Sequence, residues 1–224
     1  MTIRVMIADD EALVRAGFRL ILGTQADLEV VGEASNGHEA VDLARNHAPD
    51  VILMDIRMPG LDGIAATRLI AGPGATWPSR VVILTTYDQD EYVYDALAAG
   101  ASGYLLKDVQ PEELTRGVRL VAAGDALLAP AVTRRLIAEF ASHRRQVTSR
   151  DPSAATLTGR EHEILEHLAR GKSNAEIASC LYLSENTVKT HVASVLGKLT
   201  LRDRVQAVIW AYENGIVEPG RPNP

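Results

Sequence analysis

The 224-residue sequence contains one cysteine and no long apolar run. Cys180 therefore has no partner for an intrachain disulfide, and its apolar surroundings, IASCLYL, predict a small buried thiol. Nowhere do about 18 apolar residues follow one another, and the N-terminus, MTIRVMIADD, lacks the features of a secretory signal. These absences argue against a disulfide-stapled scaffold. They predict a soluble, cytoplasmic protein with no membrane partner.

Negative charge is concentrated in the N-terminal part of the chain. The formal net charge is −6, but it is about −9 up to Pro130, about +3 over residues 131–155 and about zero beyond. At this length the chain can form two domains, each with its own core. We therefore expect an acidic first domain and a nearly neutral second one.

Short apolar runs alternate with helical patterns from Ile3 to Ala123. The segments between the runs carry apolar residues at spacings of three and four, which is typical of amphipathic helices. This alternation indicates repeated βαβ units. We predict an α/β domain over residues 1–124, with a doubly wound, five-stranded parallel sheet and five helices. The five predicted strands are IRVMIA, LEVVGEA, DVILMD, RVVILT and SGYLL.

The rest of the chain has a different pattern. Residues 125–155 are predicted to be a linker with one probable helix, PAVTRRLIAEFASHRR, and residues 218–224 a flexible tail. Residues 156–217 have only helical patterns, and predict an all-α domain of four short helices. Capping residues mark the helix starts, each with an acid or amide three positions later. These pairs are Thr158 with Glu161, Ser173 with Glu176 and Asp203 with Gln206, while Ser184 caps a further helix.

Five functional groups fall at the ends of the predicted strands. The carboxyl ends of parallel strands meet at one edge of a sheet, so we expect these groups to converge. Three carboxylates this close repel one another by roughly 4 kcal/mol per pair at an effective dielectric near 20. A cation is needed, and oxygen ligands with open positions suit Mg²⁺. A carboxylate beside Mg²⁺ and a lysine can attack a phosphoryl group. The five groups are Asp9, Asp10, Asp55, Thr85 and Lys107.

The motifs DD, MDIRMPG, ILTT and YLLKD resemble the receiver domain of two-component response regulators, over about residues 2–123. The resemblance implies a flavodoxin-like fold, a sensor histidine kinase as partner, and no enzyme activity beyond the receiver's own Mg²⁺-dependent phosphorylation and dephosphorylation. It assigns Asp55 as phosphoacceptor. It also assigns the Mg²⁺ site to Asp9, Asp10, Asp55 and the main-chain carbonyl of Arg57, the switch to Thr85 and Tyr104, and the catalytic cation to Lys107.

One position differs from many receivers, because Asp108 rather than proline follows Lys107. A cis peptide bond without proline would cost about 3 kcal/mol, so the geometry of this bond stays open.

The C-terminal segment contains two short capped helices joined by LYLS, the form of a helix-turn-helix. At about 100° per residue, the helix over residues 185–199 has one apolar face and one face of small polar residues that fits a major groove. A simple helical bundle stays an alternative, and a net charge near zero favours it, because DNA binding needs phosphate neutralisation. The apolar face is Val188, Val192, Val195 and Leu199; the outer face is Asn186, Thr190, Ala193, Ser194 and Gly197, with Lys189 on its flank.

The motifs LTGREHEIL, SNAEIA and SENTVKTHVASVLGKL resemble the DNA-binding domain of the NarL/LuxR class of transcription regulators, over about residues 156–217. The resemblance implies a homodimer, formed on phosphorylation, that binds an inverted repeat in double-stranded DNA. It assigns base contacts to Lys189 and Thr190, beside Asn186, and backbone positioning or packing to Thr187, His191 and Lys198. The dimer contact falls on Ala207, Trp210 and Ala211.

A phosphorylation-gated transcription regulator fits all these features. Two alternatives stay open. A phosphoryl-transfer enzyme acting on metabolites would be favoured by an acid two residues after Asp55, where Arg57 stands. A ligand-sensing regulator would need an apolar pocket in place of the acidic edge.

Arg57 and Tyr87 are expected to overhang the path of hydrolytic water. Their position predicts a long-lived phosphoryl group.

Overall fold

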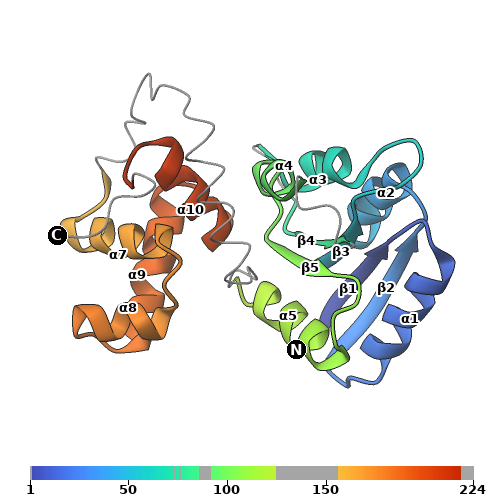
Figure 1. Ribbon diagram of the computed structural model, residues 1–224, viewed down its shortest axis with the longest axis horizontal. Helices are drawn as coiled ribbons and strands as arrows, with labels where there is room; N and C mark the ends of the chain where they lie inside the picture. The colour runs from blue at the N-terminus through green and yellow to red at the C-terminus, as the bar shows by residue number, and fades with distance from the viewer. Residues whose placement is uncertain (1, 73, 76, 86–91, 125–155, 218–224) are drawn as a thin grey trace. The chain divides into compact units, whose positions relative to one another are not determined.

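The computed structural model describes residues 2–72, 74–75, 77–85, 92–124 and 156–217 (Figure 1). The chain divides into two compact units, one up to Leu128 and one from Ala129, and each is described by itself. The predicted linker helix, the C-terminal tail and Tyr87 lie outside the described residues.

The first unit contains a five-stranded, all-parallel sheet, as the sequence predicts. Every predicted apolar run forms a strand, and the strand order is β2-β1-β3-β4-β5. The order reverses between β1 and β3, so groups just beyond these two strands face the same crevice. The strands are β1 (Ile3–Ala8), β2 (Leu28–Ala34), β3 (Val51–Asp55), β4 (Arg80–Thr85) and β5 (Gly103–Leu106).

Five helices cover the two faces of this sheet (Figure 1). Phe18 and Leu22 of α1 and Leu114 and Val118 of α5 pack with the strands in one buried cluster, so these helices share a face. The helices α2, α3 and α4 contact one another in sequence order on the other face. The helices are α1 (Ala12–Gly23), α2 (Gly37–His47), α3 (Gly63–Ala71), α4 (Val93–Ala98) and α5 (Pro111–Ala122).

The described part of the second unit, residues 156–217, is all-helical, which confirms the predicted class. Thr158 with Glu161 and Ser173 with Glu176 form the expected reciprocal capping boxes, and Ser184 caps α9. Residues from α7, α8 and α9 enclose a small apolar core. Its members are Ile164, Leu168, Ile177, Ala178 and Val188. The helices are α7 (Gly159–Ala169), α8 (Asn174–Leu181), α9 (Glu185–Lys198) and α10 (Arg204–Glu213).

The prediction that Cys180 is buried is wrong, because its side chain is exposed. The helix α8 buries Ile177 and Ala178. Cys180 follows Ala178 by two residues, which is about 200° around the helix, and so lies on the outer side. The Lys172 ammonium lies 3.2 Å from its sulfur.

No helix in the described part of the chain is long and apolar enough to cross a membrane.

Candidate functional site

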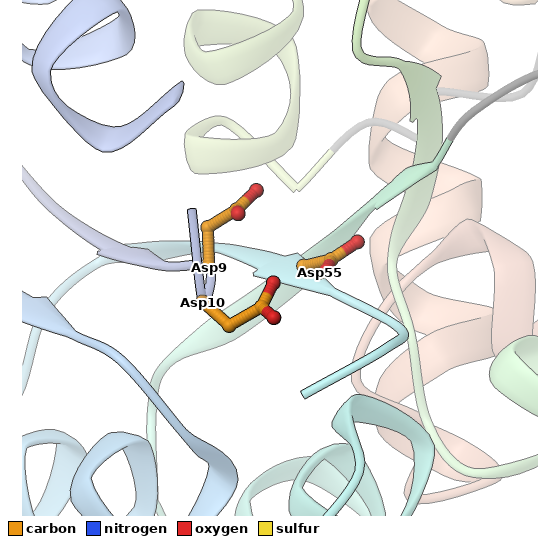
Figure 2. Close-up of side chains that lie close together, drawn as sticks. All are labelled: Asp9, Asp10 and Asp55. Carbon is orange, nitrogen blue, oxygen red and sulfur yellow. The ribbon is translucent and has the colours of Figure 1, made fainter. Parts of the chain in front are cut away.

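Three carboxylates meet beyond the ends of β1 and β3 (Figure 2). Asp9 and Asp10 follow β1, and Asp55 is the last residue of β3. One oxygen from each side chain lies within 4.8 Å of the others. Asp9 and Asp55 are buried and Asp10 is exposed, so the cluster opens to solvent on the side of Asp10.

Lys107, which follows β5 at the same edge of the sheet, completes this cluster. Its Nζ lies 2.8 Å from Asp9 Oδ2 and 3.1 Å from Asp55 Oδ1. Its main-chain amide donates a 2.7 Å hydrogen bond to the carbonyl of Thr85, which joins the ends of β4 and β5. The peptide bond between Lys107 and Asp108 is trans. The structure thus brings Asp9, Asp10, Asp55 and Lys107 together, with Thr85 on the adjoining strand.

The site favours a bound cation electrostatically. Burial raises the pKa of Asp55 to about 6; the nearby Asp9 charge adds to this rise and Lys107 opposes it. Burial also disfavours the charged form of Lys107, but hydrogen bonding to Asp9 and the charge of Asp55 outweigh this and raise its pKa. One lysine cannot neutralise three carboxylates, so a divalent cation would relieve the remaining repulsion.

The donor set fits Mg²⁺. The ligand atoms are all oxygens, and an open cleft leads to them, where water or phosphate oxygens can complete the coordination. Arg57, whose main-chain carbonyl is the predicted further ligand, is exposed and lines this cleft. Tyr92 also lines the cleft, although no sequence motif marks it. The lining includes Asp10, Arg57, Met58, Pro59, Asp62 and Tyr92.

Arg15 supports this site and was missed by the sequence analysis. Its guanidinium Nη1 donates hydrogen bonds to the main-chain carbonyls of Asp9 (2.7 Å) and Asp10 (3.3 Å). Its Nε lies 3.6 Å from Glu33 on β2. Arg15 therefore holds the main chain from which two of the carboxylates extend. Its place on α1, one turn after the acidic pair, is the only sequence signal.

A glycine allows the close packing behind Asp55. The amide of Gly63, the first residue of α3, donates to the carbonyl of Ile56 at 2.8 Å. A Cβ at Gly63 would lie 1.8 Å from the Asp55 carbonyl oxygen. Only glycine fits this contact, so α3 fixes the main chain of the predicted nucleophile.

The two predicted switch residues are buried on neighbouring strands, with Thr85 at the end of β4 and Tyr104 as the second residue of β5. Thr85 is 1% exposed and Tyr104 is 4% exposed. Tyr104 pairs with Ile83 across β4 and β5, and Thr85 pairs with Leu106. Their role in switching stays a prediction.

The predicted DNA-facing residues of α9 differ in their exposure to solvent. Asn186, Lys189 and Thr190 are exposed, whereas Thr187 and His191 are half-buried. Thr190 donates its hydroxyl to the Asn186 carbonyl at 3.0 Å, and the Thr187 hydroxyl bonds to the capping Ser184 at 2.8 Å. Thus three of the predicted contacts are accessible, and Thr187 takes part in the helix cap.

Lys198 and Ser194 differ from the other predicted residues of α9. Lys198 Nζ lies 2.6 Å from Glu161 Oε2, and Ser194 donates to Glu161 Oε1 at 2.7 Å. Ser194 therefore faces α7 rather than the outer face that the helical periodicity gave it. Of the two predicted roles of Lys198, these contacts favour packing.

The predicted dimer residues lie on α10 and are covered. Ala207 and Ala211 are fully buried, and Trp210 is 9% exposed. A dimer through these side chains requires that they are first uncovered, and this contact stays a prediction.

Comparisons with known proteins decide the family. Residues 5–119 match the family described as the response regulator receiver domain, and residues 155–211 match the luxR family of bacterial regulatory proteins. The chain is a two-component response regulator of the NarL/LuxR class. The acidic site thus belongs to a receiver domain, and α8 and α9 to a LuxR-type DNA-binding domain.

Relatives and solved structures agree over nearly the whole length of this response regulator. The uncharacterised transcriptional regulatory protein YxjL of Bacillus subtilis is 45% identical, over 96% of this chain and 98% of its own. The response regulator VraR of Staphylococcus aureus is 39% identical, over 97% and 100%. The crystal structure of the response regulator ChrA, from a heme-sensing two-component system, has 40% identity and a TM-score of 0.52, covering 96% and 99%.

Proposed function

We propose that Asp55 accepts a phosphoryl group from a sensor histidine kinase, and that this switches the chain to a dimer that binds an inverted repeat in DNA. The observation that carries the proposal is the cluster of Asp9, Asp10 and Asp55 with Lys107 Nζ 2.8 Å and 3.1 Å from two of them. Family membership supports the proposal, because the chain combines a receiver domain with a LuxR-type DNA-binding domain.

In the proposed reaction, an Asp55 carboxylate oxygen attacks phosphorus. A P–O bond forms while the P–N bond of the kinase phosphohistidine breaks, and its electron pair leaves with the imidazole, which takes up a proton. Bound Mg²⁺ would supply charge neutralisation and a fixed position for the phosphoryl oxygens. Lys107 is held where it can pair with the added negative charge.

The switch is proposed to act through Thr85 and Tyr104. Both are buried in the sheet, and Lys107, whose ammonium contacts Asp55, donates its main-chain amide to the Thr85 carbonyl. A phosphoryl group on Asp55 attracts the Thr85 hydroxyl, and the movement of Thr85 leaves space into which the Tyr104 side chain can move. This movement alters the surface around α4 and α5. This altered surface is proposed to favour a dimer in which α10 makes the contact.

Intact mass tests the acceptor. The full chain and Asp55→Asn are incubated with Mg²⁺ and acetyl phosphate, with Asp42→Asn, an exposed acid on α2, as the matched control. One phosphoryl adduct on wild type and Asp42→Asn only is expected. An adduct on Asp55→Asn would refute the assignment.

Thr85→Ala tests the switch separately from the chemistry. We expect it to accept phosphate but to lose the phosphorylation-dependent change in oligomeric state, measured by light scattering. An oligomer response equal to that of wild type would refute the role of Thr85.

A further inference from the structure

The carboxylate of Glu161 links the start of α7 to the C-terminal half of α9. It is 4% exposed and lies within its own capping box, where its Oε2 accepts from the amide (2.7 Å) and hydroxyl (2.9 Å) of Thr158. The same carboxylate also accepts from Ser194 Oγ at 2.7 Å and from Lys198 Nζ at 2.6 Å. These last two residues are 33 and 37 positions away in the chain.

We propose that Glu161, Ser194 and Lys198 form a lock that sets the position of α9, and that Lys198 is a positioning residue rather than a DNA contact. The proposal rests on the proposed function, in that α9 is taken as the helix that reads DNA.

A second capping box in the same unit shows that this arrangement is not required for capping. Glu176 accepts from the amide and hydroxyl of Ser173 at 2.7 Å and 2.9 Å, the same distances as in the Glu161 box. Glu176 is exposed, and in the described chain its carboxylate accepts hydrogen bonds from Ser173 alone. Glu161 thus adds an inter-helix role to a capping role. Hydrogen bonds from Lys198 and then Ser194 hold its pKa at about 2, so it is ionised at neutral pH.

The lock adds polar contacts to the C-terminal half of α9, where Val195 is also fully buried. Val188, in the N-terminal half of the helix, packs in the core of α7 and α8. Ser194 and Lys198 lie four residues apart, on one face of the C-terminal half. Anchoring at both halves prevents α9 from tilting or rotating. A tilt would displace Lys189 and Thr190, and a small displacement is enough to weaken base contacts.

The lock also uses the charge of Lys198. An ammonium paired with a buried carboxylate cannot bind a DNA phosphate without leaving that carboxylate uncompensated, which is costly. Both lysines are exposed, but Lys189 makes no ion pair with any described residue, whereas Lys198 pairs with Glu161. The same helix therefore carries one cation available for phosphate and one already paired within the domain.

The salt dependence of DNA binding separates these roles. The probe is a duplex selected by the phosphorylated wild-type chain from a random-sequence pool, and affinity is measured against salt for full-length variants. Lys189→Gln should reduce the slope of log K against log[salt] by about 0.9 per chain. Lys198→Gln should weaken binding and lower the unfolding temperature but leave the slope unchanged. Lys198→Arg, which keeps the ion pair with Glu161, should restore both the DNA affinity and the unfolding temperature.

Ser194→Ala and Glu176→Gln complete the test. Ser194→Ala removes no charge, and should reduce discrimination between the selected and a scrambled duplex; Glu176→Gln should leave that ratio unchanged. A slope change for Lys198→Gln equal to that for Lys189→Gln, at unchanged unfolding temperature, would overturn the lock. Failure of wild type to enrich any duplex would overturn DNA binding instead. The lock is then judged by unfolding alone, and fails if Lys198→Gln and Lys189→Gln unfold at the same temperature.

Discussion

Single side chains set the geometry of the acidic site, and Arg15 does so without contacting the predicted metal position. It holds the carbonyls of Asp9 and Asp10, and loss of such support around metal ligands typically costs tenfold or more in affinity. We expect Arg15→Gln to weaken Mg²⁺ binding by about tenfold, measured by calorimetric titration of the full chain.

Arg19→Gln is the matched control for Arg15→Gln. Arg19 also pairs with Glu33, at 2.8 Å, but among the described residues it makes no hydrogen bond or ion pair with the turn that bears the carboxylates. Its Mg²⁺ affinity should equal that of wild type. Equal losses in the two variants would show that the effect comes from Glu33 or from general charge.

The raised pKa of Asp55 implies that the stability of the fold depends on pH. Its folded value of about 6 exceeds the ordinary 3.8. The folded state therefore binds this proton more tightly than the unfolded state does. The resulting contribution to the free energy of unfolding is fully present below about pH 4 and is lost as the pH rises through about 6. Above that, the buried charge destabilises the fold. Asp55→Asn should raise the free energy of unfolding at about pH 7.5, without Mg²⁺, by about 1–3 kcal/mol.

Two further measurements test this explanation. The advantage of Asp55→Asn should shrink as the pH falls to about 4, and Asp42→Asn should show no advantage at either pH. Added Mg²⁺ should stabilise wild type more than Asp55→Asn, because the metal offsets the same repulsion. A gain that is independent of pH and Mg²⁺ would mean that packing, not charge, is the cause.

At the scale of elements, the start of α3 is packed directly against the end of β3. Gly63→Ala places a Cβ 1.8 Å from the Asp55 carbonyl oxygen, so the main chain must shift. We expect a loss of about 1–3 kcal/mol in unfolding free energy, measured by urea denaturation, and slower phosphorylation because Asp55 moves with its main chain.

Gly17→Ala in α1 is expected to raise the free energy of unfolding rather than lower it. No atom lies within 4 Å of a Cβ added there, and this helical position gains stability from alanine, by about 0.4–1 kcal/mol. If Gly63→Ala phosphorylates as fast as Gly17→Ala, then the contact between α3 and β3 does not position the nucleophile.

Local patterns predicted the elements themselves. The run RVVILT forms β4, and Ser173 with Glu176 starts α8, because apolar runs and capping boxes act within a few residues. The carboxylate cluster was also predictable, since parallel strands end at one edge. Arg15 and the Glu161 lock were not, because those contacts join separate elements. Cys180 was misplaced because an apolar stretch does not say which side of a helix is covered.

At the scale of the whole molecule, charge limits how DNA is bound. The segment over residues 156–217 has seven basic and seven acidic residues, and the chain carries −6 overall. With so few free cations, each copy can neutralise few phosphates, so a single copy should bind weakly. We therefore expect tight binding to require the proposed dimer, in which the contact of the second copy becomes an intramolecular one.

This dependence predicts sensitivity to the spacing of the two DNA half-sites. Two-fold dimers place their recognition helices about one DNA turn apart, so inserting about five base pairs turns one half-site to the opposite face. The phosphorylated chain should lose at least about tenfold in affinity for the inserted duplex, by fluorescence anisotropy, because simultaneous contact is lost. Asp55→Asn, which lacks the proposed phosphoacceptor, should bind both duplexes equally weakly. If the phosphorylated chain were indifferent to spacing, each copy would bind alone, and the α10 contact would have no part in recognition.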